Sequence, residues 1–146
     1  MPSQIKVDEI KNVAGQYKIK TNVFEGQTTA GSIAVQGEGA NTTNLQQGLN
    51  KVWIKFDMSS SFTNEDSFNV SSLDDDGTGD FGLNFTNNMA NANYPAPASA
   101  GEDNGNVLTN FGTVATSSMD GQTRQTQANS PIDKLNNSVC ILGDLA

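Results

Sequence analysis

KVWIKFD, residues 51–57, decides the fold class of this 146-residue chain. One face of an extended strand here carries only apolar side chains, namely Val52, Ile54 and Phe56. The opposite face carries Trp53 between two lysines. This alternation predicts a β-strand whose apolar face joins a core. Trp53 then needs separate cover, which we expect a packed interior or a subunit contact to provide.

Two further alternating runs lie on either side of an acidic segment. FNVS (68–71) and FGLNFT (81–86) have strand character, and DDDGTGD (74–80) between them has the composition of a turn. We therefore predict a β-hairpin over residues 68–85 with a longer loop at its tip.

The remaining sequence adds short strands and polar loops. VCIL (139–142) is an apolar run suited to a buried closing strand, in which we expect Cys140 to be a small buried hydrophobe. Residues 107–114 have weak strand character, whereas residues 115–131 look loop-like, with a turn at Asp120-Gly121. No segment has a helical period longer than two turns. The sequence therefore predicts an all-β fold, with a small antiparallel β-sandwich over residues 51–146.

Large apolar residues are scarce in this chain. Val, Ile, Leu and Phe number 31, close to the level at which disorder becomes the better prediction, whereas Asn, Ser, Thr and Gln number 53. A monomer with so little apolar material would be marginal, because ordering each residue costs about 1–2 kcal/mol. Burial between identical copies would relieve the shortage, so oligomerisation is the first inference.

The first fifty residues differ in composition from the rest. Residues 25–50 are rich in Gly, Gln, Thr and Asn, and such a segment would be ordered only along another chain or copy. We predict an extended N-terminal attachment arm over residues 1–50. The residues that we assign to assembly are Ile5, Val7, Ile10, Tyr17, Ile19 and Trp53.

Charge is divided unevenly along the chain. Residues 1–55 have a net charge of +2 and residues 56–146 a net charge of −10. An acidic body with one arginine would repel nucleic acid. The polar, charged start does not resemble a signal peptide, and the longest apolar run is far below the roughly 20 residues that span a bilayer. We expect neither a nucleic-acid partner nor membrane insertion.

The residue inventory restricts the chemistry. The chain has no histidine and one cysteine, which excludes Ser–His and Cys–His nucleophiles, Cys/His zinc sites and internal disulfides. Asp74, Asp76 and Asp80 are weak calcium candidates, since clustered carboxylates are hard oxygen ligands. The segment lacks the bidentate Glu of a calcium loop, and its flanks are predicted strands instead of helices. An acidic hairpin turn is the preferred interpretation.

Carboxylate chemistry or a lone Lys or Tyr is what remains for catalysis. A glycosidase would draw its acid pair from Asp57, Glu65, Asp66, Glu102, Asp103, Asp120 and Asp133. All of them lie in polar stretches without the apolar surroundings that raise one pKa. We therefore predict no enzymatic activity and no cofactor. Trp53 and Tyr94 could stack on sugar rings, which leaves a glycan-binding role open.

Five separated motifs follow one another in a recognisable order: VWIKF (52–56), SFNVSS (67–72), DDGTGDF (75–81), NFTNNM (84–89) and NANY (91–94). Together they resemble the C-terminal β-domain of small tail-fibre and minor structural proteins of tailed bacteriophages, those of marine phages most closely. The closing VCILGDLA (139–146) and the opening SQIKVDEI (3–10) resemble the same family. The resemblance covers most of the chain.

The resemblance implies an intertwined homotrimer in the virion, attached to other virion proteins by its arm. A short tail fibre on the particle surface is the preferred interpretation, with a capsid decoration or head-fibre protein as the alternative. We expect contact with a host-cell glycan or protein at the polar loops of residues 87–105 and 116–130. A calcium- or glycan-binding β-module is the alternative of a different class.

Overall fold

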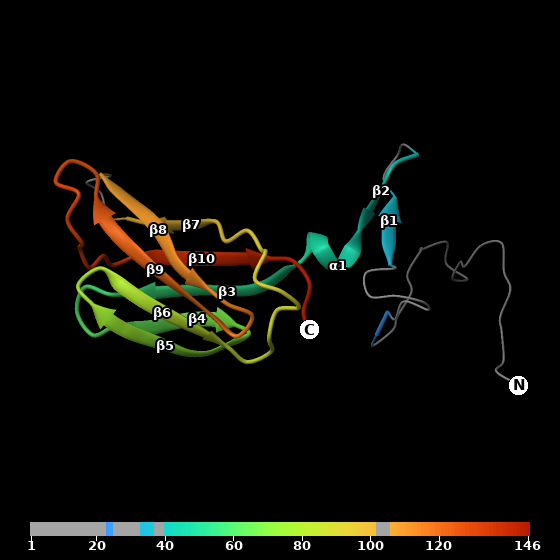
Figure 1. Ribbon diagram of the computed structural model, residues 1–146, viewed down its shortest axis with the longest axis horizontal. Helices are drawn as coiled ribbons and strands as arrows, with labels where there is room; N and C mark the ends of the chain where they lie inside the picture. Colours follow the sequence, from blue (N-terminus) through green and yellow to red (C-terminus); the bar gives the residue numbers. More distant parts are fainter. Residues whose placement is uncertain (1–22, 25–32, 37–39, 102–105) are drawn as a thin grey trace, which may run out of the picture.

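A computed structural model describes residues 23–24, 33–36, 40–101 and 106–146 of the chain. Ile5, Val7, Ile10, Tyr17 and Ile19, which we assigned to assembly, lie outside the described residues. The described chain is nearly all β, as predicted, and its main body is a sandwich of two antiparallel four-stranded sheets (Figure 1).

The first sheet has the strand order β4-β3-β10-β7. Its strands are β3 (Asn50–Asp57), β4 (Thr63–Phe68), β7 (Ala98–Ala100) and β10 (Asn137–Leu142). The second sheet has the order β5-β6-β9-β8. Its strands are β5 (Val70–Gly77), β6 (Asp80–Phe85), β8 (Val107–Val114) and β9 (Ser118–Gln125). The predicted strand at 51–57 and the predicted closing strand at 139–142 are confirmed as the two central strands of the first sheet.

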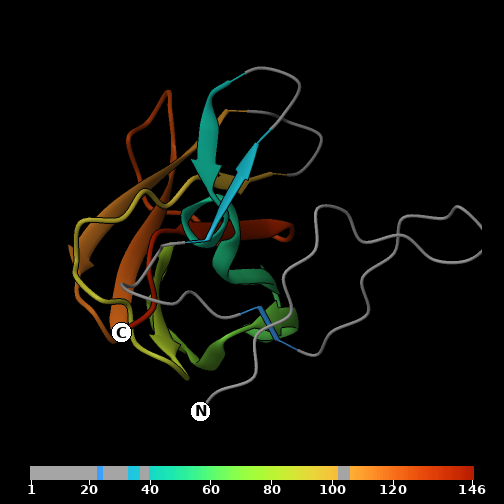
Figure 2. The same cartoon turned by 90° about the vertical axis from the view of Figure 1, so that its right-hand side faces the viewer.

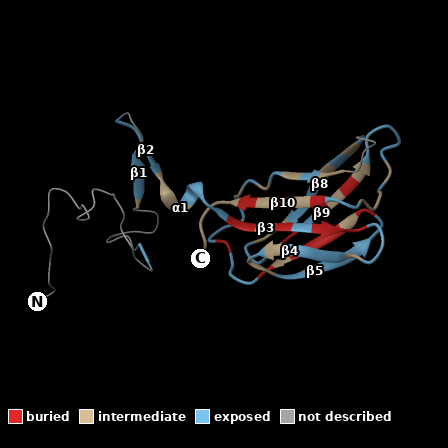
Figure 3. Cartoon of the chain, turned by 180° about the vertical axis from the view of Figure 1, so that it is seen from behind, coloured by how far each residue is buried: buried red, intermediate tan, exposed pale blue. Residues whose placement is uncertain are grey.

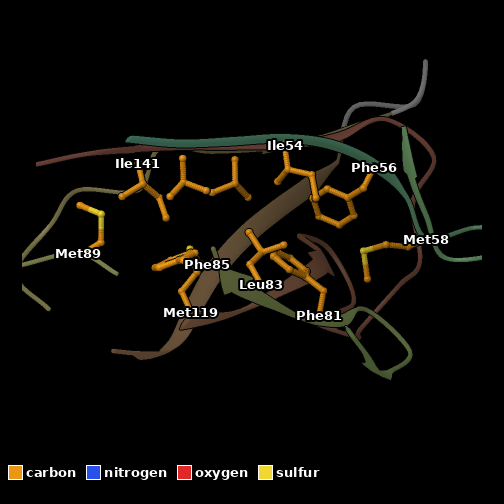
Figure 4. Packing of buried hydrophobic residues seen from close by; sticks show 11 residues of the cluster. Ile54, Phe56, Met58, Phe81, Leu83, Phe85, Met89, Met119 and Ile141 are labelled. Carbon is orange, nitrogen blue, oxygen red and sulfur yellow. The ribbon is translucent and has the colours of Figure 1, made fainter. Parts of the chain in front are cut away.

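The core lies between the two sheets (Figure 4). Its buried apolar residues are Val52, Ile54, Phe56, Met58, Phe81, Leu83, Phe85, Met89, Met119, Val139 and Ile141. Phe56 of one sheet and Phe81 of the other meet edge to face, with ring centroids 4.9 Å apart. The two sheets thus take their interior from a single chain. Although apolar residues are scarce, this part of the molecule therefore needs no burial between copies to form its core.

The predicted hairpin is confirmed, but its predicted long loop is wrong. β5 extends through the acidic residues to Gly77, which pairs with Asp80, so that only Thr78 and Gly79 form the turn. Gly79 has a φ of 75°, and a Cβ there would lie 2.6 Å from the carbonyl oxygen of Thr123. A side chain is excluded at this position, and glycine permits the tight turn.

Asn69 divides the run at 68–71 between two sheets. β4 ends at Phe68 in the first sheet and β5 begins at Val70 in the second. Asn69 adopts a φ of 61°, and its side-chain amide donates hydrogen bonds to the carbonyl oxygens of Lys51 and Asn87, both at 3.0 Å. The chain therefore turns a corner where period-two alternation continues unbroken in the sequence.

The loop predicted at 115–131 is wrong in part, because β9 occupies eight of its residues, Ser118–Gln125. Asp120-Gly121, predicted as a turn, lies in the middle of this strand, next to β6. A Cβ on Gly121 would lie 2.3 Å from Cζ of Phe81. Glycine here makes room for an aromatic ring of the core and does not mark a turn.

A small unit precedes the sandwich. It consists of the hairpin β1 (Ala34–Gln36) and β2 (Thr42–Asn44) and the single helical turn α1 (Leu45–Gly48), which leads into β3. Almost none of its residues is buried (Figure 3). We call the end of the sandwich at which α1 enters the arm end; Figure 2 views the molecule from that side.

Candidate assembly surface

Large apolar side chains remain exposed at several places in the described part of the chain. They are Val23, Phe24, Val35, Leu49, Phe68, Leu108, Phe111 and Leu135. The first five belong to the arm, to the junction before β3 or to the last residue of β4, and the other three are scattered over the sandwich. Concentrated exposed apolar surface is typical of an interaction site.

An apolar groove of about 350 Å³, here called the junction groove, lies where the arm meets the sandwich. Its apolar lining residues are Phe24, Ile33, Leu45, Leu49, Phe68 and Leu145. Phe24, Leu49 and Phe68 are each more than half exposed. The groove thus joins arm, first sheet and C-terminal tail, and sequence reasoning missed it because these residues are scattered along the chain.

Lys51, at the start of β3, binds the end of α1. Its side chain is buried, and Nζ donates hydrogen bonds to the carbonyl oxygen of Leu49 at 2.9 Å and to that of Gln46. Burial lowers the pKa of Lys51, and the charge of Asp144 acts in the opposite direction. Lys51 therefore ties the end of α1 to β3. In the sequence it looked like one of two equivalent solvent-facing lysines.

The C-terminal tail is attached at the arm end as well (Figure 1). Gln47 of α1 donates a hydrogen bond to the carboxylate of Asp144 at 3.2 Å. Backbone bonds of 2.9 Å join Ala90 to Asp144 and Ala146 to Asn88. Residues 144–146 thus bind both α1 and the segment at residues 88–90, which gives the C-terminal tail a structural role.

Trp53 is half-buried on the outer face of the first sheet, as the alternation predicted. It pairs with Phe68 on one side and with Cys140 on the other. Cys140 is therefore on the outer face and half-buried, so that the prediction of a buried cysteine is wrong. Val139 and Ile141 take the core positions instead.

A shallow groove of about 620 Å³, here called the Trp53 groove, surrounds the indole. Its polar lining residues are Asn50, Lys55, Ser99, Asn136, Asn137 and Ser138. The amide of Asn137 is bonded to the carbonyl oxygens of Phe56 and Lys134. The two serine hydroxyls are hydrogen-bonded to each other at 2.8 Å. Asn50 also lines the junction groove, and the two depressions are therefore neighbours.

Two of the calcium candidates, Asp76 and Asp80, line one depression of about 320 Å³ together with Asp120, and two accept hydrogen bonds from side-chain amides. Asp74 accepts a hydrogen bond of 2.6 Å from the amide of Asn84, and Asp80 accepts one from the amide of Gln122. Asp76 lies beside Gly82. Within the described residues, no group of three or more acidic or cysteine side chains is arranged to hold a metal ion.

The carboxylates considered for glycoside cleavage are dispersed and mostly have structural roles. Asp57 caps a turn by accepting bonds from Ser59 N–H at 2.6 Å and from the hydroxyls of Ser59 and Ser60, and these bonds lower its pKa. A general acid needs the opposite shift. Glu65 pairs with Lys55, and Asp133 accepts the Gly79 N–H at 2.6 Å. Glu102 and Asp103 lie outside the described residues.

Tyr94 is a structural residue. Its hydroxyl donates to the carbonyl oxygens of Ala115 and Ser118, at 2.9 and 3.2 Å, and its ring packs edge-on against Phe85. Burial raises the pKa of Tyr94 to about 12. The ring holds the segment before β7 against the β8–β9 turn, so its hydroxyl is already engaged within the chain.

Within the described residues, the two loops predicted to contact a host meet at the β8–β9 turn, where the Met89 N–H donates to the carbonyl oxygen of Thr116 at 2.8 Å. β7 and β9 occupy parts of them. The segment between β6 and β7 lies at the arm end, whereas the segment between β9 and β10 lies at the opposite end (Figure 1). Residues 102–105 lie outside the described residues. The polar surface opposite the arm is formed instead by the β3–β4, β5–β6 and β9–β10 connections.

Comparison with protein-family models, curated proteins and solved structures found no match to this chain. Among the described residues, no helix has the length and apolar character needed to cross a membrane. The features of this chain that bear on function are the two grooves, the exposed apolar residues and the sequence motifs.

Proposed function

We propose that this chain is a structural subunit of a bacteriophage virion, a short homotrimeric fibre of the tail-fibre type. Residues 1–50 attach it to other virion proteins and to sister copies. The sandwich is displayed on the particle, and its end opposite the arm faces the host cell. The role is mechanical and adhesive, without catalysis.

The observation that carries this proposal is the location of the exposed apolar residues. Five of the eight large exposed side chains gather on the arm and around the junction groove, although apolar residues are scarce in this sequence. A chain with a complete core that still leaves such residues exposed at one end is suited to assembly through that end. The order of motifs that resembles phage fibre domains supports the virion as the assembly.

A capsid decoration or head-fibre protein would use the same arm and the same groove. The position on the particle separates the two alternatives. Antibody against the sandwich should label purified virions at the tail, as seen by gold labelling in electron microscopy. Labelling distributed over the capsid would favour the decoration protein, and absence of the chain from purified particles would overturn the proposal.

Glycan binding at the Trp53 groove is a second candidate function. A half-buried indole surrounded by two hydroxyls, two amides and a lysine supplies the stacking surface and hydrogen-bonding groups that a sugar ring needs. Binding of host-surface oligosaccharides, measured by ligand-observed NMR, should then disappear in Trp53→Ala and persist in Tyr94→Phe. Equal signals from Trp53→Ala and the unmodified chain would rule out this site.

A further inference from the structure

The junction groove is incomplete within one chain. Leu49 is 55% exposed, Phe68 52% and Phe24 62%, although all three line the same depression. Covering apolar surface is worth roughly 25 cal/mol per Å². The groove thus has a substantial binding capacity that the described residues do not use.

The described chain begins beside this groove. Val23 and Phe24 are its first described residues, Phe24 lines the groove, and 22 residues precede them. Ile19 and Tyr17 precede Phe24 by five and seven residues, so a fully extended chain carries them roughly 17 and 25 Å away from it. These residues can therefore enter a neighbouring copy's groove only if the assembly brings the two grooves within that distance of each other.

The sequence of that segment complements the groove. In Tyr17-Lys18-Ile19-Lys20 the apolar side chains alternate with lysines, so an extended backbone presents Tyr17 and Ile19 together on one side. Residues 1–22 have four lysines and two acids, whereas residues 56–146 have a net charge of −10. Among the described residues that line the groove, the one with a charge, Lys51, is already bonded to the carbonyl oxygens of Gln46 and Leu49. The lysines of the segment therefore complement the acidic sandwich as a whole and not the lining.

We propose that Tyr17 and Ile19 of one copy fill the junction groove of a neighbouring copy, around Leu49 and Phe68. Occupation by the same chain is disfavoured. Phe24 already lines its own groove, and the intervening residues contain neither glycine nor proline for the sharp reversal that would return Ile19 there. The inference rests on the proposed trimer, in which each arm would serve the next copy around a closed ring.

Cysteine trapping tests this contact in the full-length chain. In a Cys140→Ser background, Ile19→Cys is combined with Leu49→Cys, or with Leu108→Cys as the matched control. Leu108 is 54% exposed and lies on β8, away from the groove. A parallel pair combines Tyr17→Cys with Phe68→Cys or with the same control. Mild oxidation is followed by non-reducing electrophoresis, and sedimentation velocity is recorded on the unoxidised samples.

The expected result is disulfide-linked dimers and trimers with the groove cysteines and none with the Leu108→Cys control. A disulfide within one chain, or equal linking to the control, would overturn the inference. A trimer in sedimentation that gives no disulfide with either groove position would overturn it too, while leaving the proposed assembly intact. A monomer in sedimentation would refute the proposed assembly itself.

Side-chain truncation gives a second measurement. Phe68→Ser and Leu49→Ser should each weaken self-association at least about tenfold, which corresponds to about 1.4 kcal/mol. Leu108→Ser removes a similarly exposed apolar side chain elsewhere and should leave association unchanged. Equal effects at the three positions would contradict a specific groove contact. All three residues are exposed, so these variants keep the core intact.

Discussion

At the scale of single residues, two backbone positions direct the strands to their places. Gly121 leaves space for the ring of Phe81, and Asn69 turns the chain from the first sheet into the second. Both residue types favour turns, but only Asn69 occupies one. Their roles depend on what packs against them, which the neighbouring sequence does not reveal.

Gly121→Ala should be strongly destabilising. The new Cβ would lie 2.3 Å from Phe81 Cζ, so the ring must move within a filled core, at a cost of about 1–3 kcal/mol or more. Gly112→Ala is the matched control, because its Cβ would meet nothing closer than 3.6 Å. Urea unfolding measures both. If Gly121→Ala lowered the free energy of unfolding no more than Gly112→Ala, the contact between Gly121 and the Phe81 ring would be contradicted.

Asn69→Ala should destabilise the chain by about 2 kcal/mol, because several hydrogen bonds at the sheet-to-sheet corner are lost. Asn129→Ala provides the comparison. Asn129 also has a positive φ, of 47°, but is exposed. The two variants share the cost of a left-handed alanine, so the difference between them in unfolding free energy reports the side-chain bonds of Asn69. If both variants lowered the free energy of unfolding equally, the effect would come from backbone strain alone, and the side-chain bonds of Asn69 would contribute nothing.

At the scale of elements, Tyr94 joins the segment before β7 to the β8–β9 turn. Its pKa is raised from 10.0 to about 12 by burial, so the native state retains a proton that the unfolded chain releases first. The stability from this group is fully present below pH 10 and is lost as the pH rises towards 12. Tyr94→Phe should cost about 1 kcal/mol at neutral pH through lost hydrogen bonds.

The pH profile separates burial of Tyr94 from its hydrogen bonding. The unfolding free energy of the unmodified chain should fall more steeply between pH 10 and pH 12 than that of Tyr94→Phe. Chemical denaturation at several alkaline pH values provides the comparison. Parallel profiles would show that the phenol ionises equally in both states, contrary to its burial.

Lys51 joins α1 to β3, as Tyr94 joins the segment before β7 to the β8–β9 turn. Lys51→Met keeps the apolar stem but removes the ammonium that bonds to the end of α1. The amides of Leu45 and Leu49 should then exchange with solvent about tenfold faster, while core amides are unaffected. Lys55→Met, at an exposed position, is the control in hydrogen-exchange mass spectrometry. Unchanged exchange at the junction would show that Lys51 does not hold α1.

Sequence patterns predicted the elements that alternate against a core. Val52, Ile54 and Phe56 specify β3, and the apolar run around Val139 and Ile141 specifies β10. The sequence did not predict β9, because its core positions are filled by Met119, Gly121 and Thr123. These residues do not form the apolar alternation that is typical of a strand. The sequence did not predict the junction groove either, because its lining residues extend from Phe24 to Leu145 and come together only in the folded chain.

At the scale of the whole molecule, the buried apolar residues and most of the exposed ones lie in different parts of the chain. The sandwich buries eleven apolar side chains without help from another copy, whereas the arm and junction leave theirs exposed. Scarcity of apolar residues therefore does not require shared burial in the sheets. It makes the exposed apolar side chains at the arm end the part of the molecule that a neighbour would cover.

The mass in solution tests this account most directly. Sedimentation equilibrium on the full chain and on residues 50–146 should give three times the 15.4 kDa chain mass for the first and a folded monomer for the second. Higher salt should weaken the full-length trimer, because a basic arm meets an acidic body. A full chain that remains a folded monomer at micromolar concentration, or an isolated sandwich that still forms trimers, would contradict assembly through the arm.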